Sequence, residues 1–190
     1  MWRSVAVTSA PAAEPLTTAD AKAHLRVDHS DDDTLIAAYV AAARAHVEAR
    51  TGTRLYTQTV SMKAEGWDDL ASLPIAPIQS ITSVAYVDTD GGAQTLSTDY
   101  YDARLFGLEP GIALKFGQAW PTIQDRSLIT VVAVVGYGVA NTQPPETIHA
   151  IKLIVGDMYE HRETVGEGVV SLPVAATVDA LLTNHKKHLI

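Results

Sequence analysis

The hydrophobic pattern of the chain changes its period twice, and this change restricts the fold more than any single motif does. Residues 31–50 repeat apolar side chains at helical spacing, residues 54–138 contain short apolar runs, and helical spacing returns after residue 144. Apolar positions three and four apart are typical of amphipathic helices, whereas alternation is typical of strands. The sequence therefore predicts an α+β protein, in which a helical bundle from both chain ends carries a central β-rich insert.

Two helices are predicted near the N-terminus. The first covers Thr17–Val27, with Thr17 as the N-cap and Asp20 three residues later in the capping-box position. The second covers Asp31–Arg50; its acidic first turn suits the helix dipole, and Gly52 follows its end. The apolar stripe of this second helix consists of Leu35, Ile36, Tyr39, Val40, Ala43 and Val47.

The central region contains short segments that predict strands, separated by turns such as residues 88–92 and 107–111. The last segment, Ser127–Val135, is a continuous apolar run and predicts a strand buried on both faces. Gly136 and Gly138 end it. The complete set of predicted strands is Leu55–Met62, Ile81–Val87, Ala93–Leu96, Asp99–Ala103, Ile112–Phe116 and Ser127–Val135.

Two further helices are predicted in the C-terminal part. One begins after Pro144-Pro145 and ends near Glu163, and a loop at Thr164–Ser171 follows it. The other covers Pro173–Asn184, with a stripe of Val174, Val178, Leu181 and Leu182. The expected organisation is a flexible N-terminal arm at 1–15, a helical bundle at 16–53 and 144–184, a β-rich insert at 54–140, and a tail at 185–190.

The charge of the chain excludes a protein that grips DNA by its phosphates. The formal net charge is -8 and the acidic residues are spread along the whole sequence, so there is no basic patch outside the short HKKH tail. Cysteine is absent, which excludes disulfides and thiolate metal sites. No apolar run is long enough for a signal-peptide core or a membrane span, and we expect neither.

Several local clusters could carry chemistry, but each has a simpler explanation. Asp28, Asp31, Asp32 and Asp33 lack the spacing of a calcium loop and fit helix capping. If the first two helices formed a helix-turn-helix, Asp31, Asp32 and Asp33 would point three negative charges at DNA, which argues against that motif. The seven histidines form no HExxH pair, and the cluster at residues 159–163 fits a polar helix end. The sequence thus predicts no catalytic residue, no metal ligand and no cofactor.

The C-terminal segment NHKKHLI is the one locally basic stretch, and it ends in two apolar residues. From the residues alone, a frayed terminus and a docking peptide both remain open. As a docking peptide, Leu189 and Ile190 would fill pockets while the cations pair with an acidic partner.

The order of these patterns resembles the head–tail connector (adaptor) proteins of long-tailed phages and gene transfer agents. The resemblance rests on LTTADAKAHLRVD (16–28) with DDDTLIAA, on VEARTG (47–52), on SVAYVDTDGG (83–92), and on GYG with PPETIHAIKLIVGDMYEHRE (144–163). It implies a structural subunit with no enzymatic activity, located in the virion neck and made in the cytoplasm of the host bacterium.

The resemblance also implies partners. About twelve copies would form a ring below the portal protein, would bind the stopper or tail-terminator protein, and would leave a channel through which DNA passes without specific binding. The portal-docking segment would be Asn184, His185, Lys186, Lys187, His188, Leu189 and Ile190. The alternatives are another virion neck or tail-completion protein, a DNA-packaging accessory, and a small acidic enzyme.

Overall fold

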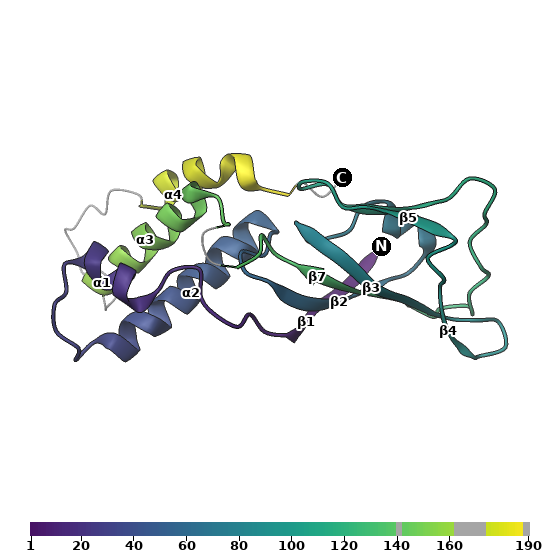
Figure 1. Ribbon diagram of the computed structural model, residues 1–190, viewed down its shortest axis with the longest axis horizontal. Coiled ribbons are helices and arrows are strands. Elements are labelled where there is room, and N and C mark those ends of the chain that lie inside the picture. Colours follow the sequence, from purple (N-terminus) through teal and green to yellow (C-terminus); the bar gives the residue numbers. More distant parts are fainter. Residues whose placement is uncertain (140–141, 162–173, 188–190) are drawn as a thin grey trace. The chain divides into compact units, whose positions relative to one another are not determined.

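The computed structural model describes residues 1–139, 142–161 and 174–187, and these residues form two compact units. The sheet unit contains Met1–Ala12, Gly52–Gly138 and Lys187, and the helical unit contains the described residues between Ala13 and Thr51 and between Val139 and Lys186. Helices and antiparallel strands are thus both present (Figure 1), and the predicted α+β class is confirmed.

The helical unit is built from four α-helices and one short 3-10 helix: α1 (Thr18–Leu25), α2 (Asp33–Thr51), α3 (Pro145–Glu160), α4 (Val174–Leu182) and η2 (Thr183–His185). Helix α3 packs against both α2 and α4, and α1 packs against α2 and α3. Among the described residues, no helix is both long and apolar enough to span a bilayer. The predicted loop at Thr164–Ser171 lies outside the described residues.

The predicted start of the first helix is confirmed. The hydroxyl oxygen of Thr17 accepts a hydrogen bond from the backbone N–H of Asp20 at 3.1 Å, and the same hydroxyl donates to the Asp20 carboxylate at 2.6 Å. The helix ends two residues earlier than expected, because Arg26 adopts the left-handed conformation with φ of 59°. That geometry breaks the helical ladder and closes the last turn.

The core of the helical unit is aliphatic. Helix α2 contributes the predicted stripe, although Leu35 and Tyr39 are only half-buried. Helix α4 differs from the prediction, because Val178 and Leu182 are buried whereas Leu181 is only half-buried. The buried apolar residues of this unit are Leu16, Ala21, Ile36, Val40, Ala43, Val47, Ala150, Ile151, Val155, Val178 and Leu182.

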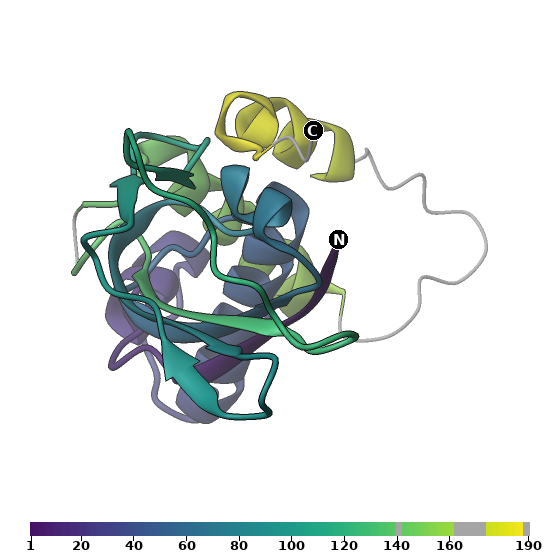
Figure 2. The same ribbon diagram turned by 90° about the vertical axis from the view of Figure 1, so that its right-hand side faces the viewer.

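The sheet unit contains a five-stranded antiparallel sheet in the order β1-β2-β7-β3-β4 and a separate hairpin of β5 and β6. The turn between β3 and β4 is at the end of the sheet that faces the viewer in Figure 2. The strands are β1 (Trp2–Ser9), β2 (Gln58–Ala64), β3 (Ile78–Val87), β4 (Ala93–Thr95), β5 (Tyr101–Arg104), β6 (Gly111–Leu114) and β7 (Ile129–Val135), and a 3-10 helix, η1, covers Trp67–Ala71.

The prediction of a flexible arm at residues 1–15 is wrong for residues 2–9, which form a strand. Trp2–Ser9 forms the edge strand β1, which pairs antiparallel with β2 in a register that places Val5 opposite Met62 and Val7 opposite Val60. The paired residues of the two strands are 50 to 62 positions apart in the sequence, so local composition gave no signal of this pairing. Val5 and Val7 have the alternation of a strand, but the sheet alone supplies the hydrogen-bond partners.

Strand β7 is central, as its apolar sequence indicates, but it is not buried on both faces. Ile129, Val131, Ala133 and Val135 are fully buried, whereas the residues between them are half-buried. The sheet is antiparallel, and such sheets commonly pack one face on the core and leave the other open. The valines on the open face reflect the preference of branched side chains for strands rather than burial.

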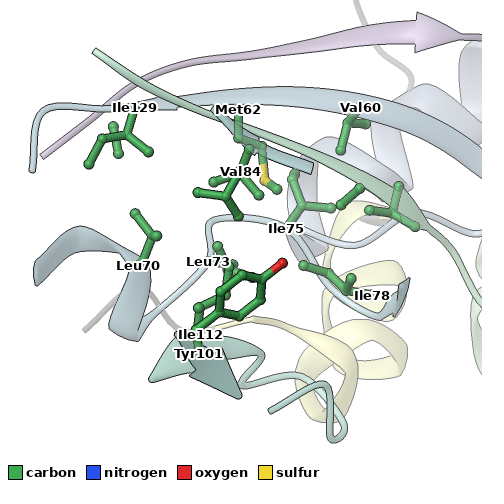
Figure 3. Close-up of a cluster of buried hydrophobic side chains, with 14 of the residues drawn as sticks. Val60, Met62, Leu70, Leu73, Ile75, Ile78, Val84, Tyr101, Ile112 and Ile129 are labelled. Carbon is green, nitrogen blue, oxygen red and sulfur yellow. The ribbon is translucent and has the colours of Figure 1, made fainter. Parts of the chain in front are cut away.

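The core of the sheet unit lies between the buried face of the sheet and a second layer. Figure 3 shows Met62, Val84 and Ile129 of the sheet pointing toward Leu70 of η1 and Leu73, and toward Tyr101 and Ile112 of the β5–β6 hairpin. Met62, Val84 and Ile129 are completely buried. A closed apolar interior of this kind stabilises the unit through the area that it removes from water.

Candidate functional site

The predicted docking segment begins in η2, which continues directly from α4. Asn184 is exposed, and His185 has its Nε2 3.4 Å from the carboxylate of Glu146 on α3. The Nζ of Lys186 lies 3.9 Å from Asp179 on α4. These contacts hold the first part of the segment against the helical unit.

Asp179 anchors α4 to α2 through a bidentate ion pair. The Nε and Nη2 atoms of Arg50 donate to the two carboxylate oxygens of Asp179 at 2.8 Å and 2.6 Å. The hydrogen bonds from Arg50, and then its charge, hold the pKa of Asp179 below its usual value of 3.8. Paired nitrogens facing paired oxygens fix orientation as well as distance, so this contact sets the direction in which α4 leads into η2.

Among the segment's described residues, 184–187, Lys187 is the most deeply buried. Its side chain is 1% exposed, its Nζ donates to the backbone carbonyl of Leu108 at 3.2 Å, and Glu109 lies 3.7 Å away. A Cβ added at Gly52 would approach the Lys187 Cβ to 3.3 Å, so the backbone passes close to Gly52. A buried ammonium requires partners of this kind, because leaving a charge unpaired away from water is costly. Lys187 is therefore part of the sheet unit as well as of the predicted tail.

The remaining residues of the predicted docking segment, His188, Leu189 and Ile190, lie outside the described residues. A truncation after Thr183 would remove Lys187 together with them, and so would disturb the sheet unit itself. A chain that ends at Lys187 separates the two effects.

The acidic residues around the start of α2 have structural partners. Asp33 accepts from Lys22 at 2.6 Å, Asp32 accepts from the Tyr159 hydroxyl at 2.7 Å, and Asp31 lies 4.0 Å from His29. These contacts tie α2 to α1 and α3. Across the described part of the chain, no group of three or more metal-binding side chains comes together.

Two other clusters also have structural roles. His161 lies 3.2 Å from Asp157 one turn earlier, at the polar end of α3, and Glu163 lies outside the described residues. Gly136 has a φ of +111°, and a Cβ there would meet the Tyr56 carbonyl oxygen at 2.3 Å. Gly136 is therefore a strand terminator, as predicted.

Exposed aromatic side chains are the surface feature that the sequence analysis missed. Phe106 and Phe116 are 84% and 106% exposed and lie on the loops before and after β6. Phe116 had been expected at the end of a strand. Strand β6 ends at Leu114, two residues earlier than predicted, so Phe116 lies on the loop that follows.

Comparison with known proteins gives a consistent result. Residues 16–104 match the sequence profile of the phage gp6-like head–tail connector proteins. Among curated protein sequences none matches significantly. Two solved structures with similar folds are described as the neck of an empty GTA particle computed with C6 symmetry and the neck of a native GTA particle computed with C12 symmetry. Their TM-scores are 0.82 and 0.80 and their identities 21% and 22%, and in both cases 99% of this chain and 97% of the other are covered.

A third similar structure is from the virion of a native gene transfer agent, with a TM-score of 0.81 and 22% identity. The resemblance inferred from the sequence is thus confirmed: residues 16–104 match the profile of the gp6-like head–tail connector proteins, and the fold is similar to those of proteins in gene transfer agent particles.

Proposed function

We propose that this chain is a subunit of a ring in the neck of a phage-like particle, between the portal protein and the stopper or tail-terminator protein. The observation that carries the proposal is the coincidence of two matches. The family profile covers residues 16–104, and the fold similarity to neck proteins of gene transfer agents covers nearly the whole chain. Those neck structures have sixfold and twelvefold symmetry, which supports a ring of about twelve copies here.

The surface of the sheet unit suits assembly with other chains. Strand β1 is an edge strand with seven exposed residues, and such edges readily add further strands or contact other subunits. Phe106 and Phe116 add exposed aromatic area that a neighbouring subunit would bury. In a ring these contacts are heterologous, so one surface of each subunit binds a different surface of the next.

The helical bundle formed by α1 to α4 then presents the docking segment, Asn184 to Ile190, to the portal. The net charge of -8 supports the passage of DNA, because an acidic wall repels the phosphate backbone and does not retain it. The ring requires neither a metal nor a cofactor.

The first test is co-sedimentation with the portal ring, using the full-length chain and a chain that ends at Lys187. The shorter chain keeps the buried Lys187 contacts, so its circular dichroism spectrum should equal that of the full-length chain. We expect saturable binding by the full-length chain and at least tenfold weaker binding by the shorter one.

Equal binding by both chains would show that residues 188–190 do not dock. Absence of binding by both would remove the portal from the list of partners and would favour another neck or tail-completion protein. Binding of duplex DNA with a steep salt dependence would contradict the passive channel.

A further inference from the structure

All three tryptophans of the chain line two adjoining hollows of the sheet unit. The first hollow, of about 490 Å³, lies between η1 and β6 and includes Trp67 and Trp120. The second, of about 700 Å³, includes Trp2. Asp68, Ala71 and Glu109 line both of them, so the hollows share a wall and form one depression, here called the tryptophan groove.

The aromatic side chains of the groove are held in place by the fold. Trp67 and Trp120 stack with ring centroids 4.8 Å apart and planes 2° apart, and Tyr86 meets Trp67 edge to face at 5.4 Å. The indole N–H of Trp67 donates to the Pro121 carbonyl, and that of Trp2 donates to the Ser72 carbonyl, both at 2.9 Å. Each tryptophan stays half-buried, and its exposed part faces water. A rigid aromatic surface binds with little loss of conformational entropy.

The groove is acidic, and the fold neutralises only part of its charge. Asp69 binds the N-terminal amine and accepts from the backbone N–H groups of Glu65 and Gly66. Glu109 lies near Lys187. Asp68, on the shared wall, is exposed and has no ion pair or hydrogen bond with any other residue that the structure describes. Arg104 is the one basic side chain among the lining residues, at the edge of the first hollow.

Free carboxylate next to half-exposed tryptophan faces is a surface that attracts cations carried on apolar chains. A Lys or Arg can place its charge near Asp68 and over an indole ring, while its methylene stem covers apolar area. Nucleic acid is excluded as an occupant, because the groove would place three carboxylates against its phosphates.

We propose that the tryptophan groove binds an extended segment of a partner protein in which Lys or Arg residues alternate with apolar residues. The cation would lie at the shared wall, and apolar neighbours would occupy the second hollow beside Trp2 and Pro74. This site is on the sheet unit, and no described residue of the docking segment lines it, although Glu109 on the shared wall lies 3.7 Å from Lys187. The test of the groove uses Asp68, which has no hydrogen bond or ion pair with the described residues of the docking segment, so its outcome does not depend on the ring or on portal binding.

The groove offers its own optical signal, because every tryptophan of the chain lines it. A library of random twelve-residue peptides is selected against the immobilised full-length protein, and enriched peptides are then titrated while intrinsic tryptophan emission is recorded. We expect enriched peptides to combine Lys or Arg with aliphatic residues or proline, and to shift the emission saturably.

Two variants complete the test. Asp68→Lys reverses the free charge on an exposed residue and should weaken the peptides at least tenfold, with unchanged circular dichroism. Asp125→Lys makes the same charge change on a residue whose side chain is 94% exposed and that does not line the groove, and should weaken them less than twofold. Failure to enrich any peptide, enrichment of acidic peptides, or equal weakening by both variants would overturn the proposal.

Discussion

A position can require glycine because its φ is positive or because a Cβ would be too close to a neighbouring atom, and four glycines of the sheet unit distinguish these two reasons. Gly66 has an ordinary backbone conformation and open space, and Gly117 has a φ of +80° with open space. Gly111 has no positive φ, but a Cβ there would lie 2.2 Å from the Ala71 carbonyl oxygen, and Gly136 combines a φ of +111° with a 2.3 Å approach to the Tyr56 carbonyl. Alanine at position 117 therefore tests backbone strain alone, and alanine at position 111 tests crowding alone. Alanine at position 136 tests both effects together, and alanine at position 66 is the control with neither.

The four changes have different expected costs in the free energy of unfolding. Gly66→Ala should be neutral or stabilising by up to about 1 kcal/mol, because alanine restricts the unfolded chain. Gly117→Ala should cost about 1–2 kcal/mol for a left-handed alanine. Gly111→Ala should cost about 1–3 kcal/mol, since η1 and β6 must move apart. Gly136→Ala carries both penalties and should cost about 2–5 kcal/mol, a large part of the roughly 5–15 kcal/mol of a typical domain.

Urea unfolding followed by tryptophan emission measures these costs, because Trp2, Trp67 and Trp120 all lie in the sheet unit and report its unfolding directly. The sign and order of the four values are the test. If Gly136→Ala were within 1 kcal/mol of Gly66→Ala, the close approach of β7 to the Tyr56 backbone would be wrong. If Gly117→Ala cost as much as Gly136→Ala, strain alone would account for the effect.

Three further predictions concern the helical unit. Leu182→Asp should unfold it, because the side chain is completely buried, whereas Leu181→Asp should cost less than half as much in urea unfolding. Asp179→Asn should lower the melting temperature at neutral pH, because it removes the ion pair with Arg50. Arg50 lowers the pKa of Asp179 in the folded protein, so the ion pair contributes its full stability above the usual pKa of 3.8. The difference in melting temperature from the wild type should vanish as the pH falls through the lowered pKa. Thr17→Ala should cost about 1 kcal/mol through loss of the N-cap, as measured by thermal unfolding monitored by helix circular dichroism.

Features encoded over a few residues were predictable from the sequence. The Thr17 cap needs only Asp20 three residues later, and the glycine at 136 ends its strand through its own backbone conformation. Features that depend on distant partners were not. Strand β1 requires β2, and the burial of Lys187 requires a carbonyl at Leu108.

The tryptophan groove shows the same limit for a site. Trp2, Trp67 and Trp120 are far apart in the sequence, and no spacing rule joins them. Antiparallel pairing of β1 with β2 and the position of η1 beside β6 bring them together. The docking segment is a different case, because its basic and apolar residues are contiguous in the sequence; its docking role follows from the family resemblance and stays a prediction.

The burial of Lys187 changes the energetics expected for a docking tail. Fixing a residue costs about 1–2 kcal/mol in backbone entropy, so the four residues from Asn184 to Lys187, which the chain already orders, would spare a docking event about 4–8 kcal/mol. Lys187→Ala removes the bond to the Leu108 carbonyl and so releases the last of these four residues; with an unchanged circular dichroism spectrum, it should weaken portal binding at least tenfold in co-sedimentation. Lys186→Ala removes only a partly exposed pair at 3.9 Å and should change binding less than twofold. Equal affinities of the two variants would mean that order at Lys187 makes no contribution to docking.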